Sequence, residues 1–152
     1  MNRALIDLLR GEPLRVPSHA LLVHFPAALL PAGVLLDLLD LALQRPALGE
    51  AAVLLYGLGL LAGVGAAGTG LLDWLEMIPG SRRRQRATRH LIIQGGALVA
   101  FLVVFLLRLG GPVAPASLVL GLAATGALFG GDHLGGLLVY EDGMRVRSGR
   151  RS

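Results

Sequence analysis

The chain has 152 residues, of which 54% are hydrophobic and 16% charged, and its mean hydropathy is +0.67. A water-soluble domain of this size needs a polar surface that this composition cannot supply, so the sequence predicts an integral protein of the lipid bilayer. The chain contains no cysteine, which excludes disulfides and cysteine-ligated iron–sulfur clusters. The net charge of +4 comes from arginines that flank apolar segments, so nucleic acid is not an expected partner.

The first 17 residues are predicted to form a charged tail. Its charged side chains are Arg3, Asp7, Arg10, Glu12 and Arg15. A segment of this charge cannot serve as the apolar centre of a cleavable signal peptide. Residues 2–10 are expected to form either a short amphipathic helix on the membrane surface or an ordinary polar tail.

Four apolar segments follow, and each reaches the ~20 residues that a membrane-spanning helix requires. Their predicted bounds are about 19–43, 49–78, 87–109 and 113–140. The connections are short, which implies antiparallel neighbours. The predicted fold is therefore all-α, an integral membrane four-helix up-down bundle over residues 18–143, with a basic C-terminal tail over residues 144–152.

The arginines predict how this bundle is oriented. They concentrate in the N-terminal tail, in the loop between the second and third segments, and in the C-terminal tail, whereas only Arg45 and Arg108 lie on the opposite side. Positively charged loops stay in the cytoplasm, so both termini are expected there.

Several ionisable side chains fall within the apolar segments. Such groups are costly in a membrane and are functional candidates for that reason. In the predicted orientation they share the cytoplasmic half of the bundle, and they are His19, His24, Asp73, His90 and His133. The alternative is that these histidines form hydrogen bonds between helices and only hold the bundle together.

Two prolines follow His24 in the first segment. Pro26 cannot donate a hydrogen bond to the carbonyl of Leu22, so a kink is predicted just past His24. The kink would turn the imidazole toward the bundle axis or make room for a ligand. Alternatively, the prolines only bend the helix, as they commonly do in membranes.

An internal repeat is suggested by two similar stretches, "TGLLDWLE" at Thr69–Glu76 and "GGLLVYED" at Gly135–Asp142. They match at an offset of 66 residues, which also separates His24 from His90. A repeat of helix pairs in one orientation implies a pseudo-two-fold axis along the membrane normal. His24 and His90 would then face each other across that axis.

Two facing histidines suit the two axial ligands of a b-type haem, or two ligands of another metal site. Glycines in the second and fourth segments would let a flat macrocycle approach, or they serve close helix packing. His133 is a second candidate ligand, and His19 lies at the rim. Asp73 or Gln94 could bond the second nitrogen of a ligand ring and fix its orientation.

The chain also resembles a known family. The resemblance is carried by "HALLVHFPAALL" (His19–Leu30), "GTGLLDWLEMIPG" (Gly68–Gly80), "RHLIIQ…FLLR" (Arg89–Arg108) and "LGGLLVYEDGMRV" (Leu134–Val146). Together they resemble a bacterial group, domain-of-unknown-function family 2231, over about residues 18 to 147. The resemblance implies four membrane helices in the bacterial inner membrane. Some relatives are joined to Rieske-type iron–sulfur domains, which implies a redox context.

The family motifs carry over to His19, His24, Pro26, Asp73, His90, Gly135, Gly136, Tyr140 and Gly143. The chain departs from the family where many relatives have a histidine before the last glycine and this chain has Asp142. Because the chain lacks the Rieske cysteines, any iron–sulfur partner would be a separate protein.

Three functions are compatible with these observations. The leading hypothesis is an electron-transfer protein, not an enzyme, that holds one b-type haem between His24 and His90 and meets a separate redox partner. The second is a cofactor-free membrane scaffold or assembly partner. Under both hypotheses the chain could form a homodimer. The third is a proton or metal-ion conduit through Asp37, Asp40, Asp73 and the histidines.

Overall fold

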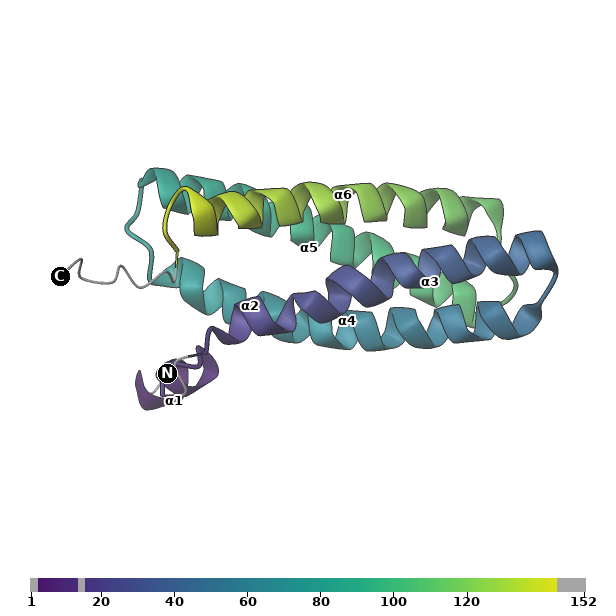
Figure 1. Ribbon diagram of the computed structural model, residues 1–152, viewed down its shortest axis with the longest axis horizontal. Helices are drawn as coiled ribbons and strands as arrows, with labels where there is room; N and C mark the ends of the chain where they lie inside the picture. The colour runs from purple at the N-terminus through teal and green to yellow at the C-terminus, as the bar shows by residue number, and fades with distance from the viewer. Residues whose placement is uncertain (1–2, 14–15, 145–152) are drawn as a thin grey trace.

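The computed structural model describes residues 3–13 and 16–144, and all regular structure in these ranges is helical. The helices are α1 (Arg3–Leu9), α2 (Ser18–Leu22), α3 (His24–Leu43), α4 (Pro46–Leu75), α5 (Arg82–Leu109) and α6 (Pro115–Tyr140). The last five form an up-down bundle, and α1 lies beside one of its ends (Figure 1). The predicted C-terminal tail lies outside the described residues from position 145 onward.

Four helical segments are long and apolar enough to cross a membrane: Ser18–Leu43, Pro46–Leu75, Arg82–Leu109 and Pro115–Tyr140. The predicted all-α fold with four spans is therefore confirmed. Large apolar side chains point outward along them, for example Leu61 (73% exposed) and Val64 (71%) on α4. An outer surface of this kind is suited to lipid rather than to water.

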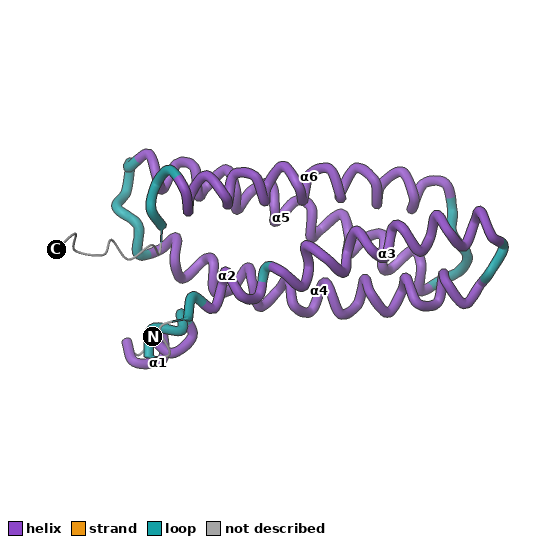
Figure 2. Tube along the Cα trace, in the orientation of Figure 1, coloured by secondary structure: helices purple, strands orange, loops and turns teal. Residues whose placement is uncertain are grey.

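The helices α4 and α5 begin earlier than hydropathy predicts, because local capping determines where each helix starts. The helix α5 begins at Arg82, because the Ser81 hydroxyl accepts a hydrogen bond from the Arg84 amide at 3.2 Å. The helix α4 begins at Pro46, because proline suits the first turn, where no amide donor is needed. The connections lie at the two ends of the bundle (Figure 2).

The first span is interrupted at Val23, between α2 and α3. Pro26 has no amide hydrogen, so the carbonyl of Leu22 receives no bond from it and the helical ladder fails at this turn. The predicted disturbance by Pro26 is therefore present, one residue before His24 rather than after it. Pro31 is accommodated within α3.

The apolar core fills the centre of the bundle, where α3 packs most extensively on α4, and α5 on α6. Its largest members are Leu30, Tyr56, Phe101 and Val104, each no more than 1% exposed. The helices α3 and α4 approach closely at Gly59, where a Cβ atom would lie 2.7 Å from Leu30 Cδ2. A small residue is therefore required for this contact.

The predicted repeat at one offset of 66 residues is not confirmed. Buried positions of α3 and α5 correspond at 71 residues, as in Leu30 with Phe101 and Asp37 with Arg108. Buried positions of α4 and α6 correspond at 65 residues, as in Ala66 with Gly131. A difference of one residue turns a helix by ~100°, so a comparison at 66 aligns different faces of α4 and α6.

Candidate functional site

Two of the candidate histidines meet at the end of the bundle where α2 and α5 begin, which we call the histidine end. The ring centres of His19 (α2) and His90 (α5) lie 6.3 Å apart, and the ring planes are inclined by 88°. Both side chains are partly buried. The helix pairs α2–α4 and α5–α6 lie apart at this end (Figure 1). His19, held on α4, and His90, held on α6, are in contact across these two pairs.

A backbone carbonyl of the neighbouring helix holds each ring. His19 Nδ1 lies 2.8 Å from the carbonyl oxygen of Ala66, and His90 Nδ1 lies 2.7 Å from that of Gly131. A carbonyl oxygen can only accept, so Nδ1 carries the hydrogen in both rings. In the neutral imidazole, Nε2 is then an acceptor available to a metal.

A glycine one turn further along lies against each ring. A Cβ atom on Gly70 would lie 2.8 Å from His19 Cε1, and one on Gly135 would lie 3.1 Å from His90 Cε1. Ala66 and Gly70, like Gly131 and Gly135, have a small-xxx-small spacing that could have been found in the sequence. Each histidine therefore occupies a seat formed by a carbonyl and a glycine.

The predicted pairing of His24 with His90 is corrected by this arrangement. His24 is exposed, and its Nδ1 lies 3.3 Å from the carbonyl oxygen of Leu21 in the preceding turn. The reason is the register: His19, at 71 residues from His90, is its counterpart, and His24 lies more than one turn further along. His133 is also exposed, on the outer side of α6.

Neither Asp73 nor Gln94 has the position expected of a partner for the Nδ1 atoms, which bond carbonyls instead. Gln94 follows His90 by one turn and donates from Nε2 to Asp132 Oδ1 at 2.6 Å. Its Oε1 is buried and has no partner among the described residues. Asp73 is buried and accepts from Arg10 Nε at 2.9 Å.

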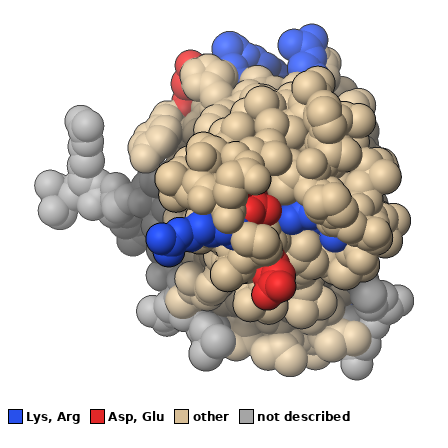
Figure 3. All heavy atoms as spheres, turned by 90° about the vertical axis from the view of Figure 1, so that its right-hand side faces the viewer, with Lys and Arg blue, Asp and Glu red and all other residues tan. Residues whose placement is uncertain are grey.

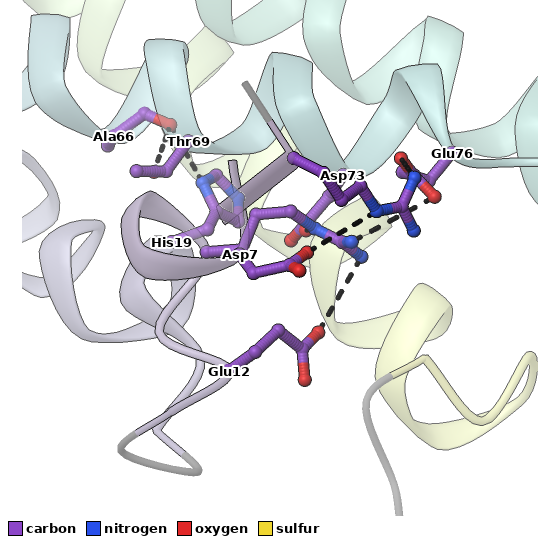
Figure 4. Close-up of polar contacts among 9 residues, drawn as sticks. Asp7, Glu12, His19, Ala66, Thr69, Asp73 and Glu76 are labelled. Atoms are coloured by element: carbon purple, nitrogen blue, oxygen red, sulfur yellow. Dashed lines mark hydrogen bonds and ion pairs between the residues drawn. The ribbon is translucent and has the colours of Figure 1, made fainter. Parts of the chain in front are cut away.

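Ion pairs surround the histidine end. Arg3 and Arg10, from α1 and the residue after it, reach Glu76 and Asp73 at the end of α4, close to His19 and Ala66 (Figure 4). On the other helix pair, Arg86 bonds Asp142 at 3.0 Å and Glu141 at 2.8 Å. A cavity of about 650 Å³ opens where α4 ends and α5 begins, and its charged lining residues are Arg10, Asp73, Glu76, Arg82, Arg83 and Asp142.

An aromatic contact joins α4 to α5 at the same end. Trp74 Nε1 donates to Thr88 Oγ1 at 2.9 Å, and Thr88 donates onward to the carbonyl of Arg84 at 2.8 Å. The Arg84 guanidinium lies 4.1 Å from the centre of the Trp74 ring. This geometry is a cation–π contact, which fixes the start of α5 against the end of α4.

The opposite end, which we call the Arg108 end, holds a buried polar cluster that the sequence did not predict. Asp37 accepts from Arg108 Nε at 3.0 Å and from the Tyr56 hydroxyl at 2.9 Å. Arg108 also donates to the carbonyls of Gly49, at 3.2 Å, and Gly111. From outside, the charged atoms of this end gather near its centre within an uncharged surface (Figure 3).

The two polar ends are separated by the apolar core around Leu30, Phe101 and Leu128. Residues 3–13 and 16–144 contain no group of three or more histidine, aspartate or glutamate side chains suited to a metal ion. The ligand set that the structure brings together is therefore a pair of imidazoles, His19 and His90.

The comparisons with known proteins agree with the four spans. No curated protein matches the chain, and no solved structure does. A family described as "Predicted membrane protein (DUF2231)" matches residues 15–148, which include α2 to α6 and both histidine seats. The chain is thus an integral membrane protein of unknown function and belongs to the DUF2231 family of predicted membrane proteins.

Proposed function

We propose that the chain binds one b-type haem between His19 and His90 and carries electrons at the membrane. The observation that carries the proposal is the matched pair of histidine seats, one on each half of the bundle. A metal–nitrogen bond is about 2.0 Å long. When two such bonds and the distance from each nitrogen to the centre of its ring are added along a line, the two ring centres lie about 6 Å apart. The 6.3 Å between the ring centres of His19 and His90 matches this requirement when both Nε2 atoms face the metal ion.

The donor set favours a haem over a bare ion. A haem iron receives four nitrogens from the macrocycle and needs only two ligands from the protein. A structural zinc ion, in contrast, takes four protein ligands. The Nδ1 hydrogen bonds to Ala66 and Gly131 support the same reading, because axial histidines need their second nitrogen held to fix the ring.

The haem would supply a one-electron couple when bound, and the residues of the chain would tune it. The carbonyls of Ala66 and Gly131 make each imidazole a better donor by accepting its Nδ1 hydrogen. Arg82, whose side chain is 80% exposed, lies at the same end of the bundle, where a separate redox protein would dock. In this proposal both termini lie in the cytoplasm of a bacterial inner membrane, as the arginine distribution favours.

The test is the optical spectrum of the detergent-purified protein, oxidised and then reduced with dithionite, after expression with added haem. We expect a Soret band with sharp reduced α and β bands, lost in His19→Ala and in His90→Ala. His24→Ala is the matched control, because His24 is exposed, and it should retain the spectrum. A featureless spectrum of the parent protein, or bands that survive both substitutions, would overturn the proposal.

A cofactor-free scaffold is the second candidate, and one observation favours it. The His19 and His90 rings already fill the spaces beside Gly70 and Gly135 and bond carbonyls of adjacent helices. In that case His19→Ala and His90→Ala would lower the free energy of unfolding of a protein that never shows a haem spectrum.

A further inference from the structure

The helix α1 has its polar and apolar faces reversed relative to a helix on the surface of a soluble protein. At ~100° per residue, Arg3, Asp7 and Arg10 fall on one face, and Leu5, Leu8 and Leu9 fall on the opposite face. The polar face makes the contacts with the bundle: Arg10, whose side chain is 14% exposed, pairs with Asp73 at 2.9 Å, and Arg3, whose side chain is 69% exposed, reaches Glu76 at 3.2 Å.

The apolar face points away from the protein. Leu5, Leu8 and Leu9 are 47%, 58% and 43% exposed. A helix that turns its charges inward and its leucines outward is suited to an apolar surrounding on its outer side. In water this arrangement would leave three adjacent leucines unburied, which the hydrophobic effect disfavours.

The level of α1 along the bundle identifies that surrounding. Its ion-pair partners Asp73 and Glu76 lie at the end of α4, where the candidate span ends at Leu75. Trp74, in the same turn, is of the residue type that concentrates at membrane interfaces. The helix lies beside this end of the bundle (Figures 1 and 2). Because the spans end there, this is the level at which a membrane would have its headgroups and first acyl carbons.

We propose that α1 is a membrane-surface anchor whose Leu5, Leu8 and Leu9 insert among the lipids of the leaflet at the histidine end. The partner is the lipid surface itself. The arginines of α1 and the residue after it are paired with carboxylates of the protein, so the leucines drive the insertion and anionic headgroups are not required. This proposal is independent of whether the protein binds haem.

One consequence follows for the histidine end. The ion pairs hold α1 against Asp73, one turn beyond the Gly70 seat of His19. The Ser18 amide at the start of α2 donates to the Arg10 carbonyl at 3.4 Å, so anchoring α1 in the lipid also holds the start of the helix that carries His19. The lipid surface, through α1, contributes to the position of His19.

Site-directed spin labelling tests the proposal cleanly, because the chain contains no cysteine. The full-length protein carries a single nitroxide at Leu8→Cys and is reconstituted in vesicles of phosphatidylcholine. Collision rates are measured with oxygen, which concentrates in the acyl region, and with a polar nickel complex, which stays in water. Two controls bracket the result: Leu61→Cys, on the lipid face of α4, and Arg82→Cys, whose side chain is 80% exposed at the start of α5.

We expect the oxygen-to-nickel ratio at Leu8→Cys to exceed that at Arg82→Cys several-fold and to approach that at Leu61→Cys. Adding phosphatidylglycerol, which supplies anionic headgroups, should leave the ratio at Leu8→Cys unchanged. A ratio equal to that of Arg82→Cys would mean that the leucines face water and would overturn the proposal. Low rates with both reagents would mean that another protein surface, such as a second copy of the chain, covers them, and would overturn it as well.

A second label checks that the helix, and not only one position, is inserted. Asp7→Cys lies on the polar face of α1, ~100° around the helix from Leu8, where Asp7 pairs with Arg3 at 3.7 Å. We expect its nitroxide to collide with oxygen less often than that of Leu8→Cys. Equal oxygen collision rates on the two faces would contradict a helix that lies flat with its leucines down.

Discussion

The two ends of the bundle use polar residues in opposite ways. At the Arg108 end, Asp37 and Arg108 are 1% and 7% exposed, and the paired groups come from α3, α4, α5 and the following turn. At the histidine end Asp73 is buried, but His19 and His90 are only partly buried, and the buried Gln94 Oε1 has no partner within the described part of the chain. Asp37 and Arg108 are paired with each other beside a cavity of about 380 Å³, whereas the histidine end leaves the Gln94 Oε1 acceptor available.

This difference indicates which end serves stability and which serves binding. A polar network that satisfies all its members inside a low-dielectric interior fixes the arrangement of the helices that supply it. Polar atoms without a hydrogen-bond partner are expected at functional sites, where the protein needs groups that can bind a ligand. The contrast indicates that the buried polar cluster of Asp37 and Arg108, which we call the clamp, holds the helices together, and it supports the proposed ligand site at His19 and His90.

Removing Arg108 should have the largest effect on stability. Arg108→Ala leaves the Asp37 carboxylate buried without its cationic partner, and breaking a buried pair in this way costs about 3–5 kcal/mol. We expect this loss in the free energy of unfolding, measured by detergent denaturation. Any haem spectrum of the remaining folded protein should be unchanged, because the substitution lies at the opposite end.

The matched control replaces both charges. The double variant Asp37→Leu, Arg108→Leu removes the uncompensated charge, and such replacements are often neutral or stabilising. We expect it to recover most of the stability lost in Arg108→Ala. If the double variant is as unstable as the single one, the clamp depends on the hydrogen bonds to Gly49 and Gly111 rather than on the ion pair.

The spans could be predicted from the sequence because lipid imposes a length and a composition on each of them. The predicted range 19–43 differs from Ser18–Leu43 by one residue. The start of α5 was missed by five residues, because the cap by Ser81 extends the helix through arginines that hydropathy excludes. Hydropathy identifies what lies in the membrane, and capping decides where a helix begins.

The histidine pair could be predicted only in part. His90 is the predicted residue whose ring lies beside a second imidazole, but which histidine faces it depends on the register between the halves. The stretch from Asp37 to Gly49 is six residues longer than its counterpart from Arg108 to position 114, so no single offset aligns both helix pairs. The offset of 66 therefore selected His24, where the fold brings in His19.

The clamp could not be predicted from the sequence, since Asp37 and Arg108 are 71 residues apart and both lie near the ends of helices. Charges at such places are usually ordinary end residues of a membrane span. Only the packing of α3 against α5 reveals that the two side chains are buried together with Tyr56.

Tyr56→Phe should weaken the clamp without opening it. The substitution keeps the ring on Phe101, whose centre lies 6.1 Å away, and removes only the hydroxyl that donates to Asp37. Hydrogen bonds between membrane helices contribute about 0.6 kcal/mol on average and reach about 1.7 kcal/mol. We expect a loss near the upper value, because Asp37 is charged, and detergent denaturation beside Arg108→Ala would measure it. A loss as large as that of Arg108→Ala would contradict the division of roles within the cluster.

A pair of glycine substitutions sharpens the comparison at the histidine end. Gly70→Ala places a methyl group 2.8 Å from His19 Cε1, whereas Gly68→Ala meets nothing within 4 Å. Overpacking of this kind costs about 1–3 kcal/mol, which the ring can avoid by rotating away. We therefore expect Gly70→Ala to lose haem occupancy with little change in stability, and Gly68→Ala to keep both. Equal spectra for the two variants would mean that Gly70 does not seat the ring.

Thr88→Val should lower stability less than Arg108→Ala and Tyr56→Phe. It tests the contact between Trp74 and Thr88 that joins α4 to α5 at the histidine end. The side chain keeps nearly the same shape but no longer accepts from Trp74 Nε1, so we expect a loss of about 0.6 kcal/mol. Trp74 is the only tryptophan in the chain, so a shift of its emission maximum reports this one contact. Thr125→Val is the control, because Thr125 bonds only the Gly121 carbonyl of its own helix and should leave the emission unchanged. If the Thr88 variant instead loses as much stability as Tyr56→Phe, the histidine end is as tightly clamped as the Arg108 end. The proposed difference between the two ends of the bundle would then be wrong.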